Sequence, residues 1–257
     1  MALLHAVGFE WEKHPHRLHT LRVAPDLPGG IEVRGGPWTT GDRATDRAVP
    51  ATTWTDASVP GELRSFGEVT AEGPGVAEAT WPLGDLAPGA VAAVAGLTVT
   101  ATSHPRGSNV AGFGVGVRER EAFVRVEAAK VPERRERFAE IAFAAEVDLA
   151  VLDNGPDGAA GSLRVEHLAA RRRTRGGFRP ADEPVELAAG EGDVLGLAGW
   201  SWRVANTPRA RGRYLRGFLV TATGSGATVV VSNRGEVTRP TVLDLAVDVV
   251  VRGPDAG

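Results

Sequence analysis

Three histidines lie close together near the start of the chain, at positions 14, 16 and 19. On an extended strand, His14 and His16 point to the same face, and His19 can join them from the next turn. Neutral imidazoles at this spacing bind zinc, copper or nickel. Pro15 separates the first two, and no acidic partner stands out, so a polar edge segment is the alternative. His14, His16 and His19 are therefore the candidate metal site.

Aspartates in turn-rich segments are a second source of metal ligands. Asp42, Asp46 and Asp56 lie in one such segment, and Asp153 and Asp157 lie in another. Calcium prefers oxygen ligands of this kind, but the spacing does not match an EF-hand loop. Asp and Asn in loops also cap their own backbone. The residues thus suggest no cofactor beyond a divalent metal ion such as calcium or zinc.

Two arginine-rich stretches are candidates for binding an anionic partner. Guanidinium groups hold carboxylates and phosphates well, so the two stretches would form an anion patch if they met in space. The alternative is a solvated strand edge, where charge blocks edge-to-edge pairing. The first stretch is Arg171, Arg172, Arg173 and Arg175, and the second is Arg209, Arg211, Arg213 and Arg216.

Tryptophans suggest a different ligand, because exposed aromatic rings stack on sugars. Trp38 and Trp54 lie in an irregular segment and are the candidate glycan contacts. Trp200 and Trp202 share one face of a predicted strand, and the matching positions in an earlier, similar segment are apolar. That match favours the core for this second pair.

The sequence contains no recognisable catalytic motif. It lacks a Gly-x-Ser-x-Gly elbow, a P-loop, a His-Glu-x-x-His pair and a dinucleotide fingerprint. It has no cysteine, so thiolate catalysis and disulfides are excluded. A net charge of -3 provides no global field for nucleic acid. We see no signal peptide and no apolar run long enough to span a bilayer, which predicts a cytoplasmic or particle-incorporated protein without membrane insertion.

An internal repeat organises most of the chain. Pro82 to Val151 return, in degraded form, as Pro184 to Val247, and both copies close on Asp-Leu-Ala-Val. Between Gly89 and Arg106 the first copy aligns without a gap against residues 192–209. A repeat of this length indicates that one structural unit occurs twice.

Strand signals dominate both copies. Apolar residues alternate with polar or small ones over 141–151 and again over 241–251, which is typical of half-buried strands. Gly/Pro turn clusters separate these from the other expected strands. The others cover 18–23, 30–34, 91–101, 112–117, 122–128, 162–168, 194–204, 214–223 and 228–232.

We therefore predict an all-β protein with two tandem antiparallel β-sandwiches of jelly-roll type. The first would cover residues 1–155, with an irregular extension at 35–75, and the second 161–257. The leading functional hypothesis is a non-enzymatic subunit of a large assembly, such as a virion or phage-tail-like particle, in contact with copies of itself or other subunits. The alternatives are a carbohydrate-binding or adhesin module, and an enzyme on a jelly-roll scaffold.

Overall fold

The protein is all-β in the computed structural model, with antiparallel pairing throughout. The structure describes residues 1–10, 17–23, 53–57, 59–104, 110–128, 140–153, 162–173, 184–204, 215–233 and 242–254. Every regular element within these ranges is a strand. No helix in them is long and apolar enough to cross a membrane. The all-β antiparallel class expected from the sequence is confirmed.

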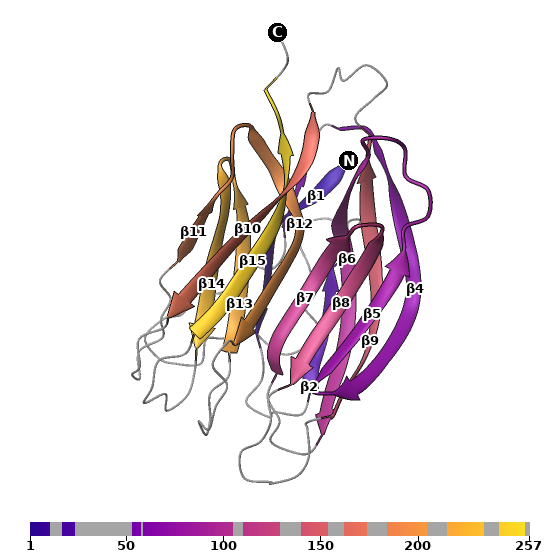
Figure 1. Cartoon of the computed structure of the whole chain (residues 1–257), viewed down its shortest axis with the longest axis vertical. Coiled ribbons are helices and arrows are strands. Elements are labelled where there is room, and N and C mark those ends of the chain that lie inside the picture. Colours follow the sequence, from indigo (N-terminus) through magenta and orange to yellow (C-terminus); the bar gives the residue numbers. More distant parts are fainter. Residues whose placement is uncertain are drawn as a thin grey trace.

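The described residues form fifteen strands, which run roughly along the long axis of the molecule (Figure 1). Those of the first half are β1 (Ala2–Glu10), β2 (Arg17–Val23), β3 (Thr53–Asp56), β4 (Gly61–Pro74), β5 (Val76–Pro82), β6 (Val91–His104), β7 (Val110–Arg118), β8 (Glu121–Ala128) and β9 (Glu140–Leu152). Those of the second half are β10 (Leu163–Arg173), β11 (Val185–Ala188), β12 (Asp193–Val204), β13 (Leu215–Thr223), β14 (Gly226–Asn233) and β15 (Val242–Arg252).

The strands form two sheets. The larger has eleven strands, with a main path β11-β14-β13-β1-β12-β7-β8-β5 from which β15, β10 and β3 branch. The smaller has four, in the order β2-β6-β9-β4. Consecutive strands often lie in different sheets, so the chain crosses repeatedly between layers.

Strand pairs of the first half have counterparts in the second. In the first half, β9 pairs with β4 on one side and with β6 on the other. In the second half, β15 pairs in the same way with β10 and with β12. Likewise, β8 pairs with β5 and β7, and β14 pairs with β11 and β13. The order of pairing partners is therefore the same for β6, β7, β8 and β9 as for β12, β13, β14 and β15.

One sheet joins strands from both sides of the domain boundary predicted at 155–161. β12 pairs with β7 through Trp200–Arg203 and Gly112–Val115, and β1 pairs with both β12 and β13. In Figure 1, β1 lies between the strands of the first half, in purple and magenta, and those of the second, in orange and yellow. The division into domains 1–155 and 161–257 stays a prediction, and the larger sheet spans it.

Alternating burial explains why these segments are strands. β15 alternates between buried and half-exposed residues along most of its length, and in β5 every second residue is buried. A strand with this pattern places one face on the core and the other towards solvent. Trp200 and Trp202 are only 1% exposed and lie in the main core cluster, which confirms their predicted role as core residues.

The segment 35–75, predicted to be irregular, requires a correction. Its second half contains β3 and the 14-residue strand β4. β4 is an edge strand with mostly exposed or half-exposed side chains, and its pairing with β9 is interrupted between Phe66 and Val69. Partial burial and this irregularity obscure the alternation by which sequence reveals a strand. The strand expected at 30–34 lies outside the described residues.

Candidate functional site

A continuous face of six strands carries the candidate site. The pairings β10–β15, β15–β12, β12–β7, β7–β8 and β8–β5 join strands of both halves side by side. Side chains alternate between the two faces of each strand, so residues directly opposite each other share a face. The outward face is therefore built from rows of residues that run across the strands.

One of these rows consists of small residues and forms the floor of a groove. Ala169 faces Ala246, Ala246 faces Ser201, and Ser201 faces Gly114. Arg125, opposite Gly114 on β8, closes the row. We call this groove the trough. It crosses four strands from β10 to β7 and ends at an arginine.

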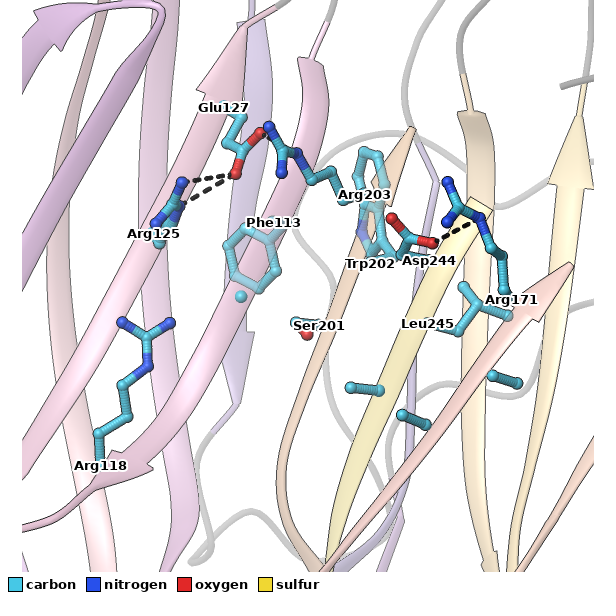
Figure 2. A pocket seen from close by; sticks show the side chains of 14 residues that line it. Phe113, Arg118, Arg125, Glu127, Arg171, Ser201, Trp202, Arg203, Asp244 and Leu245 are labelled. Atoms are coloured by element: carbon cyan, nitrogen blue, oxygen red, sulfur yellow. Dashed lines mark hydrogen bonds and ion pairs between the residues drawn. The ribbon is translucent and has the colours of Figure 1, made fainter. Parts of the chain in front are cut away.

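The next row provides a charged wall of alternating sign. Arg171 on β10 is opposite Asp244 on β15, and Asp244 is opposite Arg203 on β12. Arg203 is opposite Gly112 on β7, and Gly112 is opposite Glu127 on β8. Arg171 Nε lies 3.3 Å from Asp244 Oδ1, and Arg203 Nε lies 2.9 Å from Glu127 Oε2. Figure 2 shows Glu127 between Arg203 and Arg125.

Glu127 connects the wall to the closed end of the trough. Arg125 donates hydrogen bonds to Glu127 Oε1 from Nε, at 3.0 Å, and from Nη2, at 2.8 Å. The Glu127 side chain is 12% exposed, whereas the two arginines that it binds are more exposed. One nearly buried carboxylate thus orients two guanidinium groups. Glu78 also pairs with Arg125, with 3.5 Å between Oε2 and Nη1, so Arg203, which is 61% exposed, is the better placed of the two to offer N–H donors to a ligand.

Arg118 adds a further positive charge near the same end. Its guanidinium carbon lies 3.6 Å from the centroid of the Phe123 ring, a cation–π arrangement. The ring packs against β7 where Gly114 and Gly116 have no side chain, because a Cβ at either position would lie 3.4 Å from it. Glycines on the outward face of β7 therefore let the ring lie flat, and the ring supports Arg118.

The trough has a volume of about 570 Å³. Four arginines and two carboxylates line it, which gives the lining a net charge of +2. Adjacent strands lie about 4.8 Å apart, so the span from β10 to β8 is about 19 Å. An extended peptide advances about 3.3 Å per residue, so about six residues would fill the trough.

The residues predicted from sequence are only partly brought together here. Arg171 lines the trough, whereas Arg172 and Arg173 follow it on β10. Trp54 lies on β3 and His19 on β2, but their side chains are outside the described part, as are His14, His16, Trp38 and Arg175 entirely. Within that part, no three His, Cys, Asp or Glu side chains group as metal ligands.

Sequence reasoning missed most of the trough. Arg118, Arg125, Glu127 and Arg203 stood in no motif, and Ser201 was hidden between two core tryptophans. One signal was present: Gly112, Gly114 and Gly116 alternate along a predicted strand. Glycine at every second position leaves one face of a strand bare, which is where another group can approach the backbone.

A separate polar contact fastens β10 to the loop before β12. Glu166 accepts hydrogen bonds from the backbone N–H of Gly190 at 2.7 Å and from Arg164 Nε at 2.8 Å. The Gly190 bond, and after it the Arg164 bond, lower the pKa of the Glu166 carboxyl below its usual 4.5. This contact ties the edge strand β10 to the loop between β11 and β12.

The Glu166 contact predicts a specific acid dependence of stability. A carboxyl with a lowered folded-state pKa stabilises the protein above its unfolded-state pKa, and this contribution disappears as pH falls through the folded-state value. We expect Glu166→Gln to be less stable than wild type at neutral pH and to lose less stability on acidification below pH 4.5. Urea unfolding at several pH values measures both slopes, and equal slopes would contradict the prediction.

No protein-family model matches this chain. No curated protein and no solved structure matches it either.

Proposed function

We propose that this protein is a non-enzymatic binding protein that holds an extended, acidic segment of a partner protein in the trough, as a subunit of a larger assembly. The observation that carries the proposal is the row geometry: a floor of small residues, bounded by a charged wall and closed by arginines. A strand-like segment fits a straight, bare floor, and carboxylates on it would meet arginines at the closed end.

The charges favour binding over catalysis. Glu127 is paired with Arg125 and Arg203, and Asp244 is paired with Arg171. Carboxylates in such pairs serve to position guanidinium groups, which suits recognition of an anion. The assembly that we propose is a virion or a phage-tail-like particle, because such particles are built from sandwich subunits that bind segments of their neighbours.

The lining favours a peptide over a glycan or a nucleic acid. Phe113 and Trp202, the aromatic residues of the lining, are 7% and 1% exposed, and the Phe123 ring is covered by Arg118. Sugars and bases both use exposed aromatic faces for stacking. A carbohydrate-binding module is therefore the second candidate, to be separated by experiment.

We also infer that the chain is a duplicated sandwich of jelly-roll type. The sequence repeat and the matching pairs β4–β9–β6 and β10–β15–β12 support this inference. Two fused copies would account for the trough, because its floor crosses the line where β7 of the first copy meets β12 of the second. The binding site would then be a product of the duplication.

A labelled hexaglutamate peptide tests the proposed site by fluorescence anisotropy. We expect binding at low salt that weakens as salt rises, because screening acts on exposed charges. Ser201→Trp, which fills the floor, should abolish binding, and Arg118→Ala with Arg125→Ala should weaken it at least tenfold.

Arg120→Ala is the matched control, since this exposed arginine lies in the turn between β7 and β8 and does not line the trough. It should leave peptide affinity unchanged. Absence of peptide binding by the wild type would overturn the proposed site, and binding on a glycan array instead would favour the carbohydrate module.

A further inference from the structure

Two edge strands of the molecule, β10 and β4, differ in charge. Within the described part, β10 pairs only with β15, and β4 pairs only with β9, so each is the edge of its sheet. β10 has four arginines and one glutamate, a net charge of +3. β4 has three glutamates and one arginine, a net charge of -2. The two edges are therefore electrostatically complementary.

Exposed apolar side chains mark the same edges. Among the described residues, the large hydrophobic side chains that are exposed are Leu63 on β4 (46%), Val165 on β10 (43%) and Val76 on β5 (38%). All three strands lie at sheet edges. Exposed apolar groups on an edge strand favour pairing with another strand, because pairing buries them and satisfies open backbone groups.

The edges also lie in different parts of the molecule. β4 is in the strand group of the first half and β10 in that of the second, on opposite sides of the view in Figure 1. A contact between two different patches is heterologous, and repeating it builds a ring or a filament. A contact between identical patches would stop at a dimer.

We propose that copies of this chain join head to tail, with the β10 edge of one molecule beside the β4 edge of the next. The proposal rests on the assembly role given above and specifies its contact. Like edges repel, since both members of a β10 pair are positive and both members of a β4 pair are negative. Only a β10 edge beside a β4 edge attracts. The charges that prevent each edge from pairing with its own kind therefore also select its partner.

The interruption in β4 limits how far the new pairing extends. The register of β4 shifts between Phe66 and Val69, which divides the strand into two straight parts of about six residues. Each part is as long as an ordinary strand, so either can pair continuously with β10. Leu63 lies in the first of these two parts of β4 and Glu72 in the second. Substituting both residues therefore changes the charge of both parts.

Two edge variants test the contact. Wild type should show a mass by light scattering that rises with concentration in multiples of 26.9 kDa and falls in high salt. Arg172→Glu with Arg173→Glu changes the net charge of β10 from +3 to -1, and Leu63→Lys with Glu72→Lys changes that of β4 from -2 to +1. Each double variant alone should remain monomeric, because both of its edges then have the same sign.

An equimolar mixture of the two variants should assemble again, since every acidic edge then meets a basic one. Circular dichroism verifies that both variants are folded, and Ser201→Trp should assemble as wild type does. A wild type that is monomeric at all concentrations, a closed dimer that persists in both variants, or a mixture that stays monomeric would each overturn the proposal. The acidic β10 variant should still bind hexaglutamate, so failure of assembly and failure of the trough are distinguishable.

Discussion

Trp202→Ala is expected to lower the free energy of unfolding by about 3–5 kcal/mol, the usual cost of truncating a large buried aromatic residue. The side chain is 1% exposed and belongs to the main core cluster. On β12 it pairs with Phe113 of β7 on one side and Leu245 of β15 on the other, so the cavity would open beneath the trough. Urea unfolding followed by far-ultraviolet circular dichroism measures the loss.

Val76→Ala is the matched apolar truncation at the surface. Val76 is 38% exposed, and substitutions at such positions change stability by less than about 0.5 kcal/mol. If the two variants lost similar amounts of stability, Trp202 would not be a core residue in solution. The pairing of β12 with both neighbours would then be in question.

Gly199→Ala should lower the free energy of unfolding by about 1–3 kcal/mol, the range for overpacking a tight interior site. An added Cβ would lie 2.7 Å from the carbonyl oxygen of Val115 and 2.8 Å from Cα of Gly116. Both are backbone atoms of β7, so relief requires moving that strand away from β12. The same substitution should therefore weaken hexaglutamate binding, because the trough floor crosses this junction.

Gly67→Ala separates a packing effect from the general effect of replacing glycine in a strand. A Cβ at Gly67 has no atom within 4 Å, and β4 is an edge strand. Alanine there should be neutral or slightly stabilising, since glycine loses more conformational freedom on folding. Equal stability of Gly199→Ala and Gly67→Ala, with unchanged peptide binding, would show that β7 and β12 do not approach closely.

The stability of Trp202→Ala and Gly199→Ala and the binding of hexaglutamate all depend on one feature, the junction of β7 with β12. Trp202 supports this junction from the core, Gly199 lets the two strands approach, and Ser201 lies on its solvent side. Side chains alternate between the two faces of a strand, so Gly199 and Ser201 lie on the outward face of β12 and Trp202 on the inward face. Comparing the variants separates stability of the junction from recognition at its surface.

The sequence by itself determined the strands whose burial alternates. β9, β12 and β15 were predicted within a few residues, because the alternation of apolar and polar residues acts locally. The place of Trp200 and Trp202 in the core followed from the apolar residues at the matching positions. β1, β3, β4, β5 and β11 were missed. β3 and β11 have only four residues each, β4 is exposed along an edge, and β1 buries Leu3, Leu4, Ala6 and Val7 almost in succession, so these four strands show no clear alternation.

Only the tertiary structure decided where the trough lies. Ser201 faces Gly114, and Arg203 lies 2.9 Å from Glu127, although many residues separate the partners along the chain. The apolar pattern specifies which face of a strand is buried, but it does not select which distant strand lies beside it or in which register. The sequence therefore determined the faces, whereas the pairing of β12 with β7 determined which charges meet on them.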